Sequence, residues 1–270
     1  MIPESGGVIS NGELHLNMGA RNAQRGIAEG AAEEIYIIEH VSGTAGNETI
    51  RVKFSGREKI YKGVTKIVAH AGSGDDQIYI REGVLVPVEL NGESGTDVLF
   101  HEGSGFGTLN GGSEWDYLVI GDLADGEMNG GGGNDYMFTS STSGIVMNGG
   151  AGDDQMFGGA GDDIINGDGG RDEIYGMGGL DQIDGGTEDD LIRLDLSQAA
   201  LTTVEGGAGI DVIEITATSG GDDLVVGNIL GLNKLLVRYA EASDGSIESI
   251  EFETLMLLTL GGNDTVTVEP

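Results

Sequence analysis

The 270-residue sequence contains no cysteine, only three prolines, and 13 basic residues against 46 acidic ones. The absence of cysteine excludes disulfides, thiolate zinc sites and cysteine nucleophiles. The net charge of −33 disfavours binding to nucleic acid or to an anionic membrane, because like charges repel. Three prolines are too few for collagen, and no apolar run reaches the roughly 18 residues of a membrane-spanning helix.

Aromatic residues are also scarce, at 5% of the chain, whereas glycine is abundant, with 51 residues. This composition is typical of disordered chains, but the glycines recur at a fixed interval, which indicates a repeat architecture instead. The first residues, MIPESGGVIS, lack the basic and apolar regions of a cleavable signal, and the strand-like run TVTVEP ends abruptly. We therefore expect a piece of a longer protein.

A nine-residue sequence is repeated five times without interruption from Gly149 onward. Its copies read GGAGDDQMF, GGAGDDIIN, GDGGRDEIY, GMGGLDQID and GGTEDDLIR. The aspartates at the sixth place are Asp154, Asp163, Asp172, Asp181 and Asp190. The pattern G-G-x-G-x-D-x-U-x, in which U is a large apolar residue, is typical of a calcium-binding parallel β-roll.

Weaker copies extend this repeat in both directions, at 71–79, 92–100, 111–119, 130–138 and 206–214. Eight sixth-place aspartates then follow one another at intervals of 18 to 21 residues: Asp76, Asp97, Asp116, Asp135, Asp154, Asp172, Asp190 and Asp211. Because two nine-residue halves make one rung, these eight turns are expected to stack on one side of a solenoid. Asp163 and Asp181 belong to the opposite side, where the earlier turns at 101–107, 121–127 and 139–144 lack the pattern.

The predicted fold is all-β, a right-handed parallel β-roll over residues 70–193. Irregular β-solenoid flanks are expected at 1–69 and 194–270; alternatively, the whole chain is one continuous solenoid. Strand-like runs in the flanks include GELHLNM, EEIYIIEHV, ETIRVKF and TKIVAHA on one side and DDLVVGNI, KLLVRYA, SIESIEF and ETLMLLTL on the other. The flanks resemble each other, with Asp76 matching Asp264, which predicts neighbouring modules of the same kind in a tandem array.

The repeat has a chemical rationale. Calcium prefers about 6–8 oxygen ligands, and glycine allows the backbone angles that turn carbonyl oxygens toward an ion. Two turns stacked at strand spacing of about 4.8 Å can share one ion, with the sixth-place aspartate reaching it from beside its own backbone. The eighth-place residue then points inward, which predicts a core ladder: Ile78, Leu99, Leu118, Met137, Met156 and Ile174. Since columns of aspartate repel one another without ions, folding is expected to depend on calcium.

These residues resemble the RTX, or haemolysin-type calcium-binding, repeats of secreted bacterial proteins. The resemblance implies type I secretion, an extracellular or cell-surface location, and several bound calcium ions. It implies that the sixth-place aspartates are ligands together with glycine carbonyls: Gly130, Gly149, Gly152, Gly158, Gly161, Gly167 and Gly176. Glu114 and Glu188 replace the fourth-place glycine, so sites using those turns are in doubt. The best sites are expected between Asp135 and Asp154, Asp154 and Asp172, and Asp163 and Asp181.

Half of the aromatic residues fall in one predicted column. The ninth place carries Tyr79, Phe100, Val119, Phe138, Phe157 and Tyr175, and the seventh place adds Tyr117 and Tyr136. Strand alternation turns these places outward, which is typical of a surface that binds a glycan, a neighbouring chain or another segment. Two alternatives remain open: bulges in the 19-residue rungs that bury the rings, or simple cross-strand stacking.

The sequence offers no catalytic pattern. A G-x-S-x-G nucleophile elbow and a phosphate-loop Gly-Lys-Ser/Thr are both missing, and His15, His40, His70 and His101 are scattered, as expected of surface or strand-edge histidines. The predicted function is a non-catalytic, calcium-binding structural or adhesive module of a secreted RTX protein. The alternatives are a calcium-binding module attached to an exoenzyme (protease, lipase or polysaccharide epimerase), and a glycan-binding module that uses the aromatic column.

Overall fold

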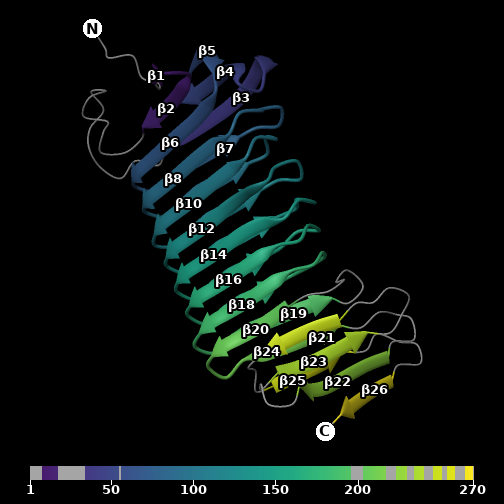
Figure 1. The fold of residues 1–270 in the computed structure, drawn as a ribbon. Coiled ribbons are helices and arrows are strands. Elements are labelled where there is room, and N and C mark those ends of the chain that lie inside the picture. Colours follow the sequence, from purple (N-terminus) through teal and green to yellow (C-terminus); the bar gives the residue numbers. More distant parts are fainter. Residues whose placement is uncertain are drawn as a thin grey trace. The chain divides into compact units, whose positions relative to one another are not determined.

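The structure is a computed structural model that describes residues 8–17, 34–54, 56–195, 203–216, 223–229, 234–239, 246–250, 254–258 and 265–269. The elements formed by these residues are all β-strands, so the predicted all-β class is confirmed (Figure 1). No helix in this part of the chain is long and apolar enough to cross a membrane. The chain divides into two compact units, residues 1–141 and 142–270. The boundaries predicted at 69/70 and 193/194 remain predictions.

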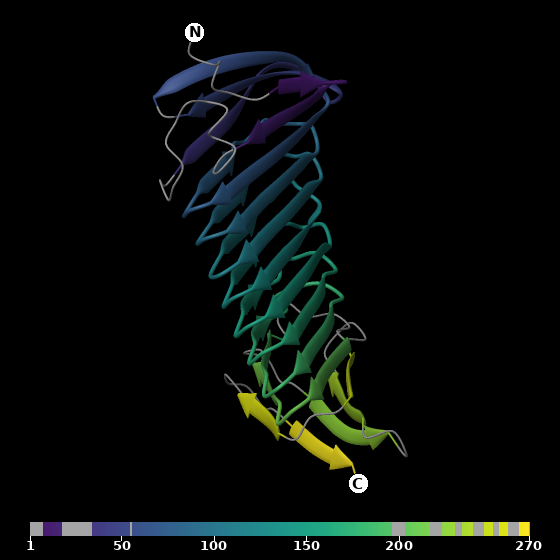
Figure 2. The ribbon, with the colours of Figure 1, turned by 90° about the vertical axis from the view of Figure 1, so that its left-hand side faces the viewer.

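The first unit contains two sheets whose strands alternate along the chain (Figures 1 and 2). One sheet has the order β1 (Val8–Ser10), β2 (Glu13–Asn17), β6 (Lys66–Ser73), β8 (Val88–Ser94), β10 (Gly107–Ser113) and β12 (Gly126–Gly132). The other has the order β13 (Tyr136–Thr139), β11 (Tyr117–Ile120), β9 (Val98–His101), β7 (Gln77–Ile80), β3 (Ile35–Thr44), β4 (Asn47–Phe54) and β5 (Arg57–Val64). From β6 onward all pairings are parallel, as a β-roll requires.

The second unit repeats this plan. One of its sheets has the order β14 (Ile145–Ala151), β16 (Ile164–Gly169), β18 (Gln182–Thr187), β20 (Thr203–Ala208), β24 (Ser246–Ile250), β23 (Lys234–Tyr239), β22 (Asp223–Ile229) and β26 (Thr265–Glu269). The other contains β15 (Gln155–Phe157), β17 (Glu173–Tyr175), β19 (Leu191–Asp195), β21 (Val212–Thr216) and β25 (Thr254–Leu258). Within each unit the paired residues are one rung apart, for example Leu99 with Leu118 and Met156 with Ile174.

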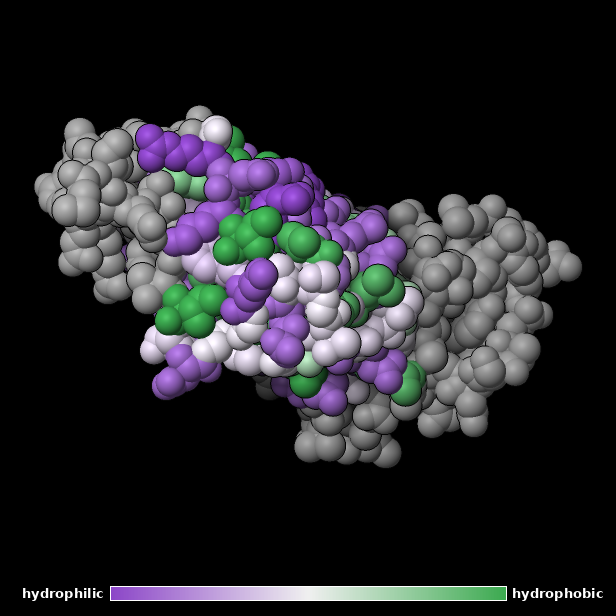
Figure 3. All heavy atoms as spheres, turned by 90° about the horizontal axis from the view of Figure 1, so that it is seen from above, coloured by the Kyte–Doolittle hydropathy of each residue, from purple (hydrophilic) through white to green (hydrophobic). Residues whose placement is uncertain are grey.

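The core lies between the two sheets and is only two side chains deep. Strand alternation turns every second residue inward, and the predicted ladder from Ile78 to Ile174 is fully buried. The facing sheet supplies a second ladder of buried apolar residues: Leu90, Leu109, Met128, Met147, Ile165, Ile183 and Val204. On the face seen in Figure 3, hydrophobic residues form small groups separated by hydrophilic ones.

The flanks differ from simple solenoid rungs, because both contain antiparallel strands. The strand runs predicted from the sequence are all found, but β3, β4 and β5 form an antiparallel meander, as do β22, β23 and β24. The sequence pattern does not reveal this, since antiparallel and parallel strands share the same alternation. Asp264, the predicted counterpart of Asp76, lies outside the described residues.

Two polar side chains are buried against the meander and its neighbouring turns. Glu48 of β4 accepts the backbone N–H groups of Leu85 and Val86 at 3.1 Å each, and its Oε1 lies 2.5 Å from Nδ1 of His40. His101, predicted at the surface or a strand edge, is fully buried, which corrects that expectation. Its ring lies where side chains at Gly103 and Gly107 would be, and its Nε2 donates to the Gly105 carbonyl at 2.7 Å. Burial lowers the pKa of His101, which favours the neutral ring.

We expect Glu48→Ala to destabilise the first unit by about 3 kcal/mol, because two buried N–H groups lose their acceptor and His40 loses its partner. Urea unfolding in saturating calcium measures this as a shift in midpoint at constant slope. Glu58→Ala is the control, since Glu58 is 60% exposed and its loss is expected to cost less than about 0.5 kcal/mol. Equal midpoints for the two variants would contradict the prediction.

Candidate calcium sites

Each candidate turn leads from a strand of one sheet to a strand of the other, and most of these turns contain two left-handed backbone positions. The turn that begins at Gly158 has none at its second and fourth places, and the turn that begins at Gly206 has one, at Gly207. At the second place, positive φ angles occur at glycines such as Gly112 and Gly150. At the fourth place they occur at glycines such as Gly133 and Gly152, and also at Glu114 (73°) and Glu188 (75°). The two glutamates therefore keep the backbone conformation of the glycine that they replace, at the steric cost that non-glycine residues bear there.

The sixth-place aspartates form a continuous hydrogen-bonded column within each unit. In seven pairs of these aspartates one oxygen, Oδ1, accepts the backbone N–H of the aspartate one rung earlier, at 2.8 to 3.0 Å. The pairs are Asp76 with Asp97, Asp97 with Asp116, Asp116 with Asp135, Asp154 with Asp172, Asp172 with Asp190, Asp190 with Asp211, and Asp163 with Asp181. All ten of these aspartates are buried.

The second carboxylate oxygen is left without a partner in the middle of these columns. Oδ2 of Asp76, Asp97, Asp116, Asp172 and Asp190 is buried and accepts no hydrogen bond. A buried charged oxygen without a partner is costly, and it needs a cation or a proton. This is the observation by which the residues present fit calcium, a hard cation that prefers oxygen ligands.

The first-place glycines make room for these oxygens. A Cβ built on Gly149 would lie 2.4 Å from Oδ2 of Asp154 and 2.7 Å from the carbonyl oxygen of Gly167. The same double contact recurs at Gly158 and Gly167, and a Cβ on Gly176 would lie 3.0 Å from Oδ2 of Asp181. At Gly149, Gly158 and Gly167, therefore, even a Cβ would crowd the carboxylate, although the copy at 71–79 has Ala71 at its first place.

The carbonyl oxygens of the candidate glycines point along the stack of turns. The carbonyl of Gly130 lies 2.6 Å from a Cβ built on Gly111, and those of Gly152 and Gly161 lie 2.0 Å from Cβ positions on Gly170 and Gly179. The structure thus places carboxylate and carbonyl oxygens beside the same first-place positions, and their role as calcium ligands remains a prediction. No group of three or more acidic or histidine side chains gathers as a metal cluster in the part of the chain that the structure describes, so backbone oxygens are needed to complete a site.

A second, outer set of carboxylates was not predicted. The fifth-place aspartates accept the fifth-place N–H of the following rung: Asp75 from Thr96, Asp153 from Arg171, Asp162 from Leu180, and Asp189 from Ile210, at 2.8 to 3.0 Å. Glu114 and Glu188 likewise accept the N–H groups of Gly95 and Gly170. The signal in the sequence is the run of two adjacent acidic residues, which a search for one ligand per turn overlooks.

Burial raises the pKa of the column aspartates. It raises the pKa of Asp97, Asp135 and Asp172 to about 6, of Asp76, Asp181 and Asp190 to about 7, and of Asp116 to about 8. Neighbouring carboxylates add to the increase for most of them, whereas the hydrogen bond from the previous rung opposes it. Without a metal ion, therefore, these carboxylates bind protons near neutral pH.

A known protein family matches part of the same repeat region. Four copies of the RTX calcium-binding nonapeptide repeat match the chain, over residues 127–144, 146–174 and 157–192. The chain contains an RTX calcium-binding repeat region. No curated protein matches the chain. The RTX turn geometry extends beyond the matched residues, because Asp76, Asp97 and Asp116 upstream and Asp211 downstream have the same burial and the same hydrogen bonds.

The aromatic column of the RTX region faces outward, as predicted, but its rings are half-buried rather than fully exposed. Tyr79, Phe100, Phe138, Phe157 and Tyr175 all have intermediate exposure, and Val119 is buried. Pairing of β7 through β13 proceeds without a register shift, so bulges do not invert the alternation. Rings stack across strands at 4.9 Å for Tyr117 with Tyr136 and at 4.5 Å for Phe157 with Tyr175. Stacking therefore accounts for part of the column.

We expect Gly111→Ala to destabilise the first unit in calcium, because its Cβ would lie 2.4 Å from Oδ2 of Asp116 and 2.6 Å from the Gly130 carbonyl. Gly132→Ala is the matched control, since nothing lies within 4 Å of its Cβ. Circular dichroism during calcium titration should show a loss of at least about 2 kcal/mol for Gly111→Ala and little change for the control. Similar titration curves would contradict this reading of the turn.

In excess chelator, stability is expected to rise as pH falls from about 8 to 5. Burial raises the pKa of Asp97, Asp76 and Asp116 from the ordinary value of 3.8 to about 6, 7 and 8 in the folded chain. The folded chain therefore binds more protons, and its stability is complete below the unfolded pKa and lost as pH rises through the folded values. Glu39 and Glu89, whose pKa values are lowered by lysine partners, act in the opposite direction but are fewer. Circular dichroism in chelator at several pH values, with the calcium-saturated chain as the reference, measures the effect as recovery of β-structure toward pH 5; no recovery at the acidic end would contradict it.

Proposed function

We propose that this chain is a non-catalytic structural module of a secreted protein, which folds when calcium binds outside the cell. The RTX repeats and the β-roll support a calcium-binding structural role. The observation that carries the proposal is how Asp76, Asp97, Asp116, Asp172 and Asp190 use their two oxygens: Oδ1 accepts a backbone N–H, and Oδ2 is buried without a hydrogen-bond partner. A bound cation would supply the missing partner at these five aspartates.

The ligands we propose are the sixth-place aspartates and the carbonyls of the glycine turns. In one column they are Asp76, Asp97, Asp116, Asp135, Asp154, Asp172, Asp190 and Asp211; on the other side they are Asp163 and Asp181. The carbonyls are those of Gly130, Gly149, Gly152, Gly158, Gly161, Gly167 and Gly176. Calcium would supply positive charge that offsets the repulsion between carboxylates one strand spacing apart.

The expected energy is large enough to control folding. Extracellular calcium modules have dissociation constants of about 0.1–1 mM, and each site at tenfold excess calcium contributes about 1.4 kcal/mol. Six sites would contribute about 8 kcal/mol, which is comparable to the whole stability of an ordinary domain. A chain with a net charge of −33 and a core only two side chains deep has little other stabilisation to replace it.

We further propose that the module is secreted and has an adhesive or surface-coating role. The cysteine-free, acidic composition supports a protein that stays unfolded at the low calcium concentration of a cytoplasm and folds in a calcium-rich medium. Dependence of the fold on calcium would favour one-way export, because only the exported chain can bind enough ions to fold.

Calcium titration of the full chain tests the proposal. We expect β-structure by circular dichroism to be lost in excess chelator and restored by calcium, with several ions bound by calorimetry. Asp172→Asn keeps an oxygen for the Asp154 N–H but removes the charge, so the calcium midpoint is expected to rise about tenfold. Asp184→Asn, on an exposed position of β18, makes the same charge change outside the turns and is the control. Full β-structure in chelator, or equal midpoints, would refute calcium-coupled folding.

A further inference from the structure

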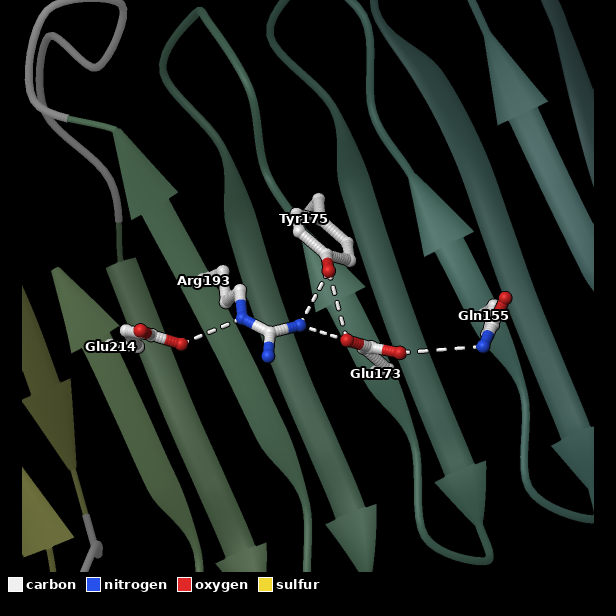
Figure 4. Close-up of polar contacts among 5 residues, drawn as sticks. All are labelled: Gln155, Glu173, Tyr175, Arg193 and Glu214. Atoms are coloured by element: carbon white, nitrogen blue, oxygen red, sulfur yellow. Dashed lines mark hydrogen bonds and ion pairs between the residues drawn. The ribbon is translucent and has the colours of Figure 1, made fainter. Parts of the chain in front are cut away.

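In two places the aromatic column holds an arginine of the chain itself over a ring. In the second unit the guanidinium carbon of Arg193 lies 5.1 Å from the ring centroid of Tyr175, and Nε lies 2.6 Å from Glu214 (Figure 4). Its Nη1 contacts both Glu173 and the Tyr175 hydroxyl. The arrangement combines a flat aromatic face with carboxylates at its edge, which is the combination that attracts a guanidinium group.

The first unit contains the same arrangement at Tyr79. The guanidinium carbon of Arg81 lies 4.9 Å from the ring centroid of Tyr79, and Nη1 lies 3.2 Å from Glu102. The outer face of this sheet therefore uses arginine, ring and carboxylate together in both units. These two arginines show which chemical group such a surface accepts.

Next to Arg81 the ring and carboxylate components recur without a basic residue. A groove of about 370 Å³ has Phe100, Val119 and Phe138 of three adjacent strands along its floor. Its edges carry Glu82, Glu102 and Asp122, and none of its lining residues is basic. Within the described residues, no lysine or arginine lies over the rings of Phe100 or Phe138.

The charges of the groove are only partly balanced within the chain. Arg81 pairs with Glu102, and the Ser140 hydroxyl donates to Asp122, but Glu82 and Asp122 are exposed. Leu123 on the rim is 71% exposed, which offers an apolar contact for an aliphatic stem. The net charge of −33 adds a long-range attraction for cations and a repulsion for anions.

We propose that this groove binds the guanidinium group of an arginine side chain presented by a peptide or protein partner. An anion is repelled by the three carboxylates, and a neutral sugar could stack on the rings but would gain nothing from the acidic edges. A bare divalent cation would use the carboxylates but not the aromatic floor. The groove has room for one side chain, so several modules or several arginines would be needed for strong attachment. The proposal goes beyond calcium binding, because the groove residues are not turn ligands.

The test uses the full chain in saturating calcium, titrated by NMR with a blocked peptide that contains two arginines separated by glycine. The same peptide with citrulline in place of arginine keeps the shape and removes the charge. A third peptide has lysine in place of each arginine. We expect the arginine peptide to bind at millimolar concentration and the lysine peptide to bind more weakly, because an ammonium group lacks a planar face. We expect the citrulline peptide to bind at least about tenfold more weakly than the arginine peptide. Equal binding of the citrulline peptide, or no binding of the arginine peptide, would overturn the proposal.

Variants locate the binding. Asp122→Asn with Glu82→Gln is expected to weaken the arginine peptide about tenfold, and Phe138→Leu, which keeps an apolar side chain but removes the ring, about threefold. Glu127→Gln with Asp184→Asn, which removes the same two charges from β12 and β18 outside the groove, is the control and should leave affinity unchanged within about twofold. Calcium titration of every variant should match the original chain, which separates loss of the groove from failure of calcium-coupled folding.

Two competition experiments complete the design. Neutral glucose oligosaccharides should not displace the arginine peptide, and displacement by them would assign the groove to glycans instead. Calcium beyond saturation of the turns should weaken binding only as much as an equal ionic strength of sodium chloride. A stronger effect of calcium would show that the groove holds the divalent cation and would overturn the proposal.

Discussion

Neighbouring turns of this protein bury a column of carboxylates that the backbone can satisfy only in part. The N–H of one sixth-place aspartate binds the carboxylate of the next, for example Asp154 to Asp172, and this fixes the direction of each side chain. The second oxygen of Asp172 is buried without a hydrogen-bond partner and lies beside the first-place Gly167. The glycines of the turn leave room for that oxygen and for the cation or proton that neutralises it.

Glycine has two separate duties in this arrangement. At the first place it gives room to the carboxylate, since a Cβ on Gly167 would lie 2.3 Å from Oδ2 of Asp172. At the second and fourth places it gives the left-handed backbone that directs carbonyls along the stack. The first requirement is steric, whereas the second is conformational and other residues can meet it. Glu93, Glu114, Asp168, Met177 and Glu188 all occupy left-handed positions, and the two fourth-place glutamates gain a hydrogen bond from the neighbouring rung.

The outer face of the aromatic sheet follows a different rule from the turns. Its rings stack across strands, and two of them are covered by arginines of the chain that carboxylates hold in place. In the groove lined by Phe100 and Phe138, within the described residues, no arginine of the chain covers the rings. A module can thus obtain rigidity from calcium at its turns and selectivity from the sheet face, because the two sets of residues do not overlap.

The sequence by itself determined the rung length, the two aspartate columns and the core ladder from Ile78 to Ile174. It could do so because each rung contacts mainly its neighbours, so a fixed interval in the sequence becomes a fixed stacking in space. Only the tertiary structure decided how each carboxylate divides its two oxygens, that the Glu114 and Glu188 turns keep the glycine conformation, that His101 is buried, and that β3, β4 and β5 pair antiparallel. The last two features depend on contacts between residues whose separation in sequence follows no period, as does the contact of Glu48 with the Leu85 and Val86 amides. A repeat pattern does not predict such contacts, because they form only in the folded chain between residues at no fixed interval.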